Sequence, residues 1–136
     1  MAIVEQLIRS EDDGTLSFGN YKLPEKAKVE EFPFDGSSYK VKTFREITRL
    51  ERDGMFAYES VPGTSVNNFA QSDEGVQFTV SGVEDAQLTI GLCEDATYSV
   101  FVNGEQIGDM KTNMSGKLSV SVELSEGTEI SVKITK

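Results

Sequence analysis

The sequence predicts an all-β fold, in which N-terminal β-hairpins pack on a C-terminal antiparallel β-sandwich. Aliphatic and polar residues alternate through 117–124 and 129–135, so one face of each segment is aliphatic and the other polar, as in half-buried antiparallel strands. Turn signals between residues 73 and 136 recur at about the 8–12-residue spacing of a sandwich and separate six expected strands.

The chain has 136 residues, which suits one compact unit with a soft boundary between an N-terminal hairpin region (1–72) and a C-terminal sandwich (73–136). Hydrophobic residues make up 38% of it, enough for a core, and no run approaches the ~18 apolar residues of a spanning helix. The first ten residues lack a basic region and carry Glu5 in their apolar stretch, unlike a secretory signal. We therefore expect a cytoplasmic protein.

The formal net charge of −10 restricts the kinds of partner that we expect the protein to bind. Nucleic acids and anionic membrane surfaces both require clustered Lys and Arg, so we expect neither as a partner. A strongly acidic surface keeps a protein soluble, and it could also attract a basic partner or Ca²⁺.

The residues that are missing exclude several chemistries. The chain has no histidine, which removes Ser–His–Asp and Cys–His catalytic arrangements and histidine-containing zinc sites. Its one cysteine, Cys93, cannot form an internal disulfide, which fits a reducing compartment, and we expect it to be structural.

Carboxylate chemistry has only weak support. Most acidic residues fall in turns, where they are usually solvated or bonded to their own backbone. No acidic stretch has the alternating spacing of an EF-hand loop, so a Ca²⁺ site formed by a single loop is the one cofactor site that the sequence still allows. We assign no catalytic residue and no metal ligand.

In the N-terminal region, residues 2–18 favour a strand, a turn and a return strand, although residues 3–8 also have helical spacing. A second hairpin is expected from 29–34 and 39–44, with Pro33 requiring an edge or bulged position because it cannot donate to a ladder. Residues 45–53 could form a short helix or extend the strand.

The stretch from Tyr58 to Ser65 is the most loop-like segment that still carries aromatic, acidic and hydroxyl groups. Residues 55–61 predict a strand that ends at Pro62-Gly63, a pair that favours a type II turn. Because binding sites concentrate on loops held by a scaffold, we expect any ligand site there. The candidate ligand-binding residues are Tyr58, Glu59, Thr64 and Ser65.

The segment 97–111 predicts a hairpin around Asn103-Gly104, a pair that readily adopts the positive φ angles of a type I′ turn. An uninterrupted ladder from this turn pairs Val100 with Ile107 and Tyr98 with Asp109. Phe101 and Met110 then share the face opposite to that of Tyr98. We expect these two residues to form an apolar interface.

Two resemblances accompany these patterns. The segments 14–19, 39–44, 58–64 and 97–134 together resemble a group of short proteins from anaerobic Firmicutes that carry the label endosialidase. True endosialidases are large phage tailspike enzymes that use Arg, Glu and His in the sialic acid site, and because this chain is much shorter and has no histidine the resemblance assigns no catalytic residue. Separately, 97–134 is similar to the accessory β-sandwich domains of polysaccharide-active enzymes, which implies a fold rather than a function.

Three functions follow as hypotheses. The first is a non-enzymatic structural or protein-interaction module that self-associates through Phe101, Met110 and exposed strand edges. The second is a carbohydrate-binding module. The third is an enzyme of the carboxylate-only type found among glycosidases.

Overall fold

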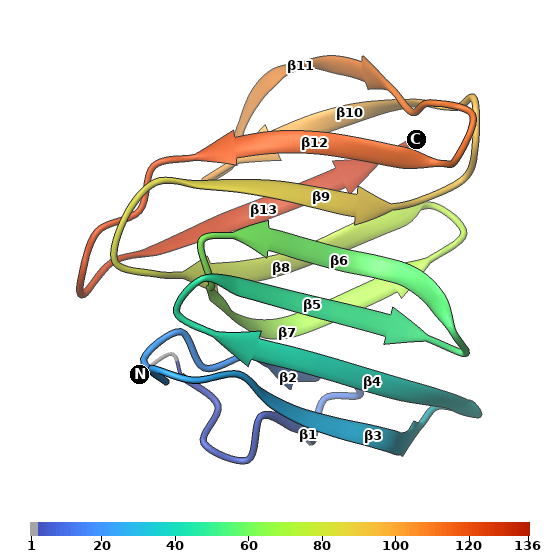
Figure 1. The fold of residues 1–136 in the computed structure, drawn as a ribbon. Helices are drawn as coiled ribbons and strands as arrows, with labels where there is room; N and C mark the ends of the chain where they lie inside the picture. Colours follow the sequence, from blue (N-terminus) through green and yellow to red (C-terminus); the bar gives the residue numbers. More distant parts are fainter. Residues whose placement is uncertain (1–2) are drawn as a thin grey trace.

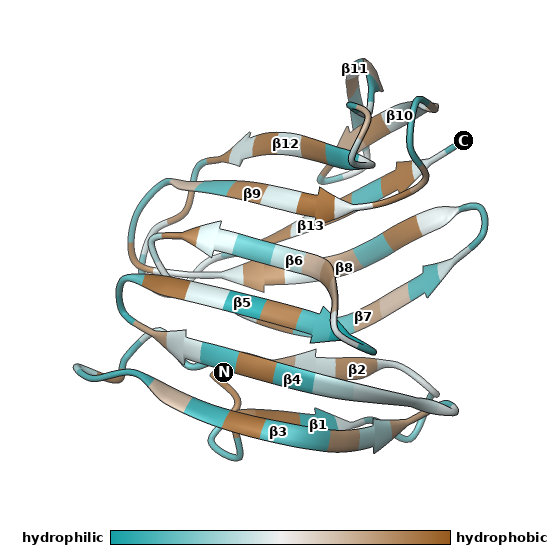
Figure 2. Ribbon diagram, turned by 45° about the vertical axis from the view of Figure 1, so that its right-hand side comes forward, coloured by the Kyte–Doolittle hydropathy of each residue, from teal (hydrophilic) through white to brown (hydrophobic). Residues whose placement is uncertain are grey.

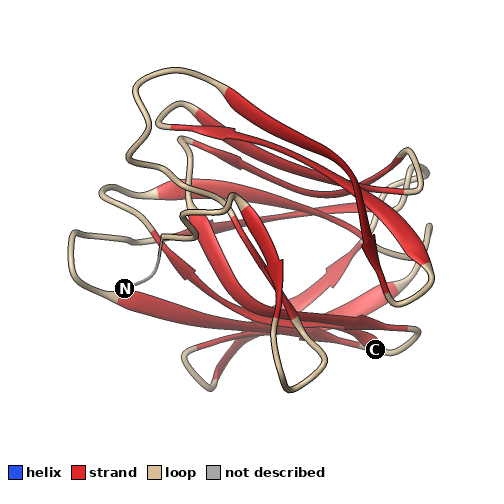
Figure 3. Cartoon of the chain, turned by 90° about the horizontal axis from the view of Figure 1, so that it is seen from below, coloured by secondary structure: helices blue, strands red, loops and turns tan. Residues whose placement is uncertain are grey.

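The computed structural model describes residues 3–136, and within them the chain forms thirteen strands in two antiparallel sheets. The sheets lie face to face as the two layers of a sandwich (Figure 1). Figure 3, which views the molecule from below, shows strands and connecting loops only. The described residues contain no helix, and so none that could cross a membrane. The all-β sandwich predicted from the sequence is confirmed.

One sheet has seven strands and the other has six. In spatial order, the seven-stranded sheet consists of β1 (Ile8–Ser10), β2 (Leu16–Phe18), β7 (Ser65–Ser72), β8 (Gly75–Ser81), β13 (Glu129–Thr135), β10 (Thr97–Val102) and β11 (Glu105–Lys111). The six-stranded sheet consists of β12 (Lys117–Val122), β9 (Ala86–Gly91), β6 (Met55–Val61), β5 (Ile47–Arg52), β4 (Ser37–Phe44) and β3 (Ala27–Phe34). Each sheet joins strands from both halves of the chain, at the β7–β8 and β6–β9 ladders.

The core follows from the alternation along the strands. Figure 2 shows hydrophobic and hydrophilic residues alternating along most of them, as expected when one face of each sheet is buried. Four aromatic rings meet edge to face or stacked between the layers, with centroids 5.3 to 5.7 Å apart for the closest pairs. They are Phe18, Tyr58, Phe69 and Phe78.

Several local expectations for the N-terminal region are met. Within the ambiguous segment 2–18, of which residue 2 lies outside the described residues, Ile8–Ser10 and Leu16–Phe18 form the strand pair β1–β2. Residues 45–53 form no helix: Ile47–Arg52 is strand β5, which pairs with β4 and β6. Pro33 lies in β3, an edge strand that is also bulged between Val29 and Phe32.

The turn at Pro62-Gly63 differs from the predicted type II turn. The Val61–Pro62 peptide bond is cis, and Gly63 does not have a positive φ. Glycine is required there for space instead, because a Cβ atom would overlap the carbonyl oxygen of Phe44. Close backbone approach is the other common reason for glycine at a fixed position.

The register of the β10–β11 hairpin is the main correction. Asn103 and Gly104 have the predicted positive φ angles, and Val102 lies opposite Glu105 as expected. Beyond the turn the ladder is bulged between Val100 and Phe101, which shifts the later pairs by one residue. The pairs Val100–Ile107 and Tyr98–Asp109 are therefore wrong. Val100 lies opposite Gly108, and Tyr98 lies opposite Met110.

Candidate functional site

The bulge separates the two residues expected to share an apolar face. Met110 lies opposite the buried Tyr98 and packs against the core. Phe101 follows the fully buried Val100 and is half-buried on the opposite, outer face of the seven-stranded sheet. The apolar pair that motivated self-association at this position is therefore absent, and Phe101 is left among polar neighbours.

Those neighbours form a groove of about 430 Å³ on the outer face of the sheet, which we call the Phe101 groove. The groove is built by the central strands β8, β13 and β10, together with single residues of β7 and of the β10–β11 turn. Its lining residues are Asn68, Gln77, Phe78, Thr79, Phe101, Gly104, Ser131 and Lys133.

Cross-strand pairing explains why these residues meet. Lys133 of β13 lies directly opposite Gln77 of β8 on one side and Phe101 of β10 on the other. Ser131, two residues earlier on β13, lies opposite Thr79. Directly opposite residues have Cβ atoms about 4.5–5.5 Å apart, so an aromatic ring, an amide, an ammonium group and two hydroxyls share one small area.

Most polar side chains of the groove have no internal partner, and Asn68, whose amide donates to Thr15 Oγ1 and Asp13 Oδ2, is the exception. In the described part of the chain, the side chains of Gln77, Thr79 and Ser131 make no hydrogen bond, and Lys133 makes no ion pair. Gln77, Ser131 and Lys133 are exposed. Donors and acceptors that are free and grouped beside an aromatic ring can serve a bound molecule without breaking any contact of the fold.

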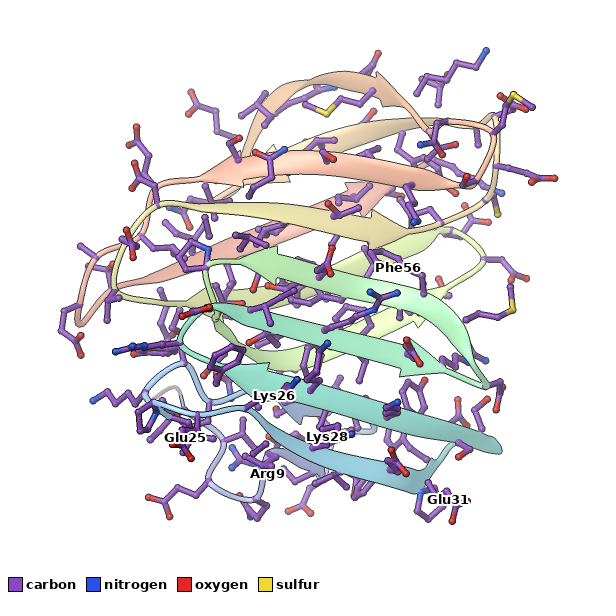
Figure 4. The ribbon with its side chains drawn as sticks, viewed as in Figure 1. Arg9, Glu25, Lys26, Lys28, Glu31 and Phe56 are labelled. Carbon is purple, nitrogen blue, oxygen red and sulfur yellow. The ribbon has the colours of Figure 1, made fainter. Side chains whose placement is uncertain are left out.

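On the outer face of the six-stranded sheet, by contrast, charged side chains do have partners within the protein. Arg49 lies 3.4 Å from Glu51 and 3.6 Å from Glu59, and its guanidinium carbon lies 5.3 Å from the ring centroid of Phe56. Lys117 approaches the same ring to 4.5 Å. Figure 4 shows Phe56 on β6 of this sheet. Arg49, Lys117 and Phe56 on this face are therefore already engaged with neighbouring side chains.

The structure places three of the four predicted ligand residues in the core. Tyr58, Thr64 and Ser65 are fully buried, and only Glu59 points outward, toward Arg49. Tyr58 and Glu59 belong to β6, which confirms the strand predicted over 55–61, whereas Ser65 does not lie in a loop but begins β7.

The buried hydroxyls satisfy one another. The Tyr58 hydroxyl lies 2.7 Å from Thr64 Oγ1, which also lies 2.7 Å from Ser60 Oγ. Thr64 N donates to Thr48 Oγ1, and Ser65 Oγ donates to the carbonyl of Gly19. Burial raises the pKa of the Tyr58 hydroxyl well above its ordinary value, so it stays protonated.

A second concavity lies at one end of the sandwich and has a volume of about 530 Å³. Its lining includes Phe56, Cys93 and Lys117, but also the buried Tyr98, whose hydroxyl already accepts a hydrogen bond from Cys93 N. Over residues 3–136, no three Cys, Asp or Glu side chains gather as metal ligands would.

The alternation through 129–135 placed Ser131 and Lys133 on a polar strand face, but the sequence did not identify them as one site with Gln77 and Thr79. Strand alternation gives the face of each residue, whereas only the strand order of the sheet gives its neighbours. One signal for the position of Phe101 was available, since Gly108 interrupts the β11 pattern and an isolated glycine in a strand indicates a bulge.

Comparisons of the chain with protein-family models, with curated proteins and with solved structures found no match. The function therefore has to be argued from the residues of the site.

Proposed function

We propose that the protein is a non-enzymatic carbohydrate-binding module and that the Phe101 groove holds a sugar ring. The observation that carries this proposal is the grouping of one accessible aromatic ring with unpartnered amide, hydroxyl and ammonium groups. A pyranose has the matching chemistry, because its C–H face packs on an aromatic ring while its hydroxyls need both donors and acceptors.

Five of the lining residues then have a role that their chemistry supports. The Phe101 ring supplies the apolar platform. Gln77 both donates and accepts, and the Thr79 and Ser131 hydroxyls do the same. Lys133 donates only, and its positive charge would favour a sugar that carries a carboxylate.

The lining favours binding over hydrolysis. Glycosidases of the common type need two carboxyl groups that flank the scissile bond. The residues that line the Phe101 groove include no Asp or Glu. A sugar held there would meet no carboxyl group among the described residues that line the groove.

The test is a printed array of neutral and acidic oligosaccharides, followed by an NMR titration with the strongest binder. We expect shifts of the backbone amides of Gln77, Phe101 and Lys133. Phe101→Ala should weaken binding by about tenfold or more, since 1.4 kcal/mol is lost per factor of ten and aromatic contacts are of that size. The control is Ile107→Ala, an exposed residue of the same hairpin that does not line the groove and should leave affinity unchanged.

A silent array would contradict the proposal, as would shifts confined to the six-stranded sheet. The amide spectrum of each variant shows whether a lost affinity reflects a lost fold.

A further inference from the structure

The two sheets end in four edge strands, and three of these carry features that hinder pairing with another chain. β1 has only three residues. β3 is bulged, contains Pro33 and carries the charges of Lys28, Glu30 and Glu31. β11 is bulged against β10 and contains Gly108 at a φ of +149°.

The fourth edge, β12, has none of these features. Its six residues pair with β9 without interruption, from Lys117 opposite Gly91 to Val122 opposite Ala86. It contains no proline or glycine, and Lys117 is its only charged residue. β11 stands above β12 in Figure 1, but its backbone pairs only with β10 in the described part of the chain. A regular, weakly charged edge of this kind is a template for another strand.

The direction of the backbone groups of β12 follows from one hydrogen bond. Leu92 N donates to Gly116 O at 2.7 Å, and these two residues lie opposite each other in the extended β9–β12 register. Bonded and non-bonded pairs alternate in an antiparallel ladder. The backbone groups of every second residue therefore point toward β9. These residues are Leu118, Val120 and Val122. The backbone groups of the intervening residues point to the open edge, namely Lys117, Ser119 and Ser121.

The residues along this edge are complementary to themselves. Residues 117–123 read Lys-Leu-Ser-Val-Ser-Val-Glu, an alternation that is the same in both directions and ends in opposite charges. About a two-fold axis at Val120, Ser119 faces Ser121 of the partner subunit, and Lys117 faces Glu123 of the partner subunit. In this register, the backbone N–H and C=O groups that point away from β9 in one β12 strand lie opposite the same groups of the other β12 strand. The exposed charges pair twice, and opposite charges directly across a ladder are stabilising.

We propose that the protein forms a symmetric homodimer in which two β12 strands pair antiparallel and join the six-stranded sheets into one continuous sheet. A second copy of this chain is the partner that supplies the matching sequence and both charge pairs. This edge belongs to the opposite sheet from the Phe101 groove, so the dimer and the sugar site can be tested, and can fail, independently.

The first experiment measures solution mass by sedimentation equilibrium over a range of protein concentrations. The wild-type protein should approach the dimer mass as concentration rises. Ser119→Pro should remain a monomer, because it removes an N–H that pairing requires but that has no partner within one copy. Ser119→Thr, which keeps that N–H, is the matched control and should dimerise like the wild type.

Charge reversal identifies the register. Lys117→Glu and Glu123→Lys should each raise the dimer dissociation constant by about tenfold, because each turns two attractive pairs into repulsive ones. The double variant restores both pairs with reversed signs and should recover wild-type association.

Three results would overturn the dimer. One is a wild-type monomer at about 1 mM, where even a small transient interface is populated. Another is a dimer that persists in Ser119→Pro, which would locate the interface elsewhere. The third is a double variant no better than either single variant, which would exclude this register. The amide spectrum of Ser119→Pro checks that its monomer is folded.

Discussion

At the scale of single residues, the hydroxyl cluster around Tyr58 shows how a segment that looks like an exposed loop can lie in the core. The stretch carries Glu, Ser and Thr beside Pro62-Gly63, which on composition alone indicates a surface turn. The structure buries the hydroxyls because each finds a partner: Thr64 Oγ1 lies 2.7 Å from both Tyr58 and Ser60. Sequence composition cannot reveal this pairing, since it depends on which strands lie side by side.

This cluster predicts a measurable contribution to stability. Tyr58→Phe removes one hydroxyl and leaves Thr64 with one partner fewer in a buried site, so the free energy of unfolding should fall by about 1–2 kcal/mol. Urea denaturation followed by circular dichroism measures the change. Tyr39→Phe is the control. The Tyr39 ring is also buried, but its hydroxyl makes no hydrogen bond in the described residues, so a loss under about 0.5 kcal/mol is expected. Equal losses in the two variants would contradict the role of the cluster.

The carboxylate of Glu11 predicts a dependence of stability on pH. A hydrogen bond from the Ser17 hydroxyl, and a smaller contribution from Arg9, hold the pKa of Glu11 below its ordinary value of 4.5. The folded state therefore takes up this proton less readily than the unfolded state. The resulting stabilisation is present above pH 4.5 and is lost as the pH falls through the lower, folded-state pKa.

Glu11→Gln should therefore lose less stability than the wild type between about pH 6 and about pH 3. Glu11→Gln will remove only part of the pH dependence of stability. Hydrogen bonds to Asp13 from Thr15 and to Asp53 from Ser38 also lower the pKa of those two carboxyls, and both remain in the variant. Thermal unfolding at the two pH values measures it, and parallel pH profiles would rule out the contribution of Glu11.

At the scale of elements, the strands could be predicted well because alternation and turn chemistry act locally. All six strands expected between residues 73 and 136 are present, as is the hairpin at Asn103-Gly104. The register beyond that turn could not be derived by assuming an uninterrupted ladder. One extra residue in β11 turns Ile107 outward and Met110 inward, and so changes the surface around Phe101 from apolar to polar.

The alternation of buried and exposed residues in β13 predicts that adjacent positions differ sharply in whether they tolerate a charged side chain. Val132 is fully buried in the strand that pairs with both β8 and β10. Val132→Asp would bury an unpaired carboxylate and should unfold the protein. Ser131→Asp, one residue earlier on the exposed face, should stay folded. Circular dichroism at 25 °C separates the two, and a folded Val132→Asp variant would show that this face is not the core.

At the scale of the whole molecule, the seven-stranded sheet depends on how its strands are ordered along the chain. The boundary drawn at residues 72 and 73 falls in the turn between β7 and β8, which pair from Ser65–Ser81 to Ser72–Gly75. Turn residues look alike in a hairpin and in a linker between two units, so the sequence could not distinguish them. The Phe101 groove depends on the same ordering, because its β8 and β10 residues meet only through β13.

The central position of β13 has a consequence for how the protein is made. β13 is the last of the thirteen strands in the described residues, yet it fills the middle of the seven-stranded sheet between β8 and β10. Until β13 has emerged from the ribosome, β8 and β10 each present an open edge to solvent or to a chaperone. The sheet can close only after residues 129–135 have been synthesised, and a chain truncated before Glu129 would keep two edges available for aggregation.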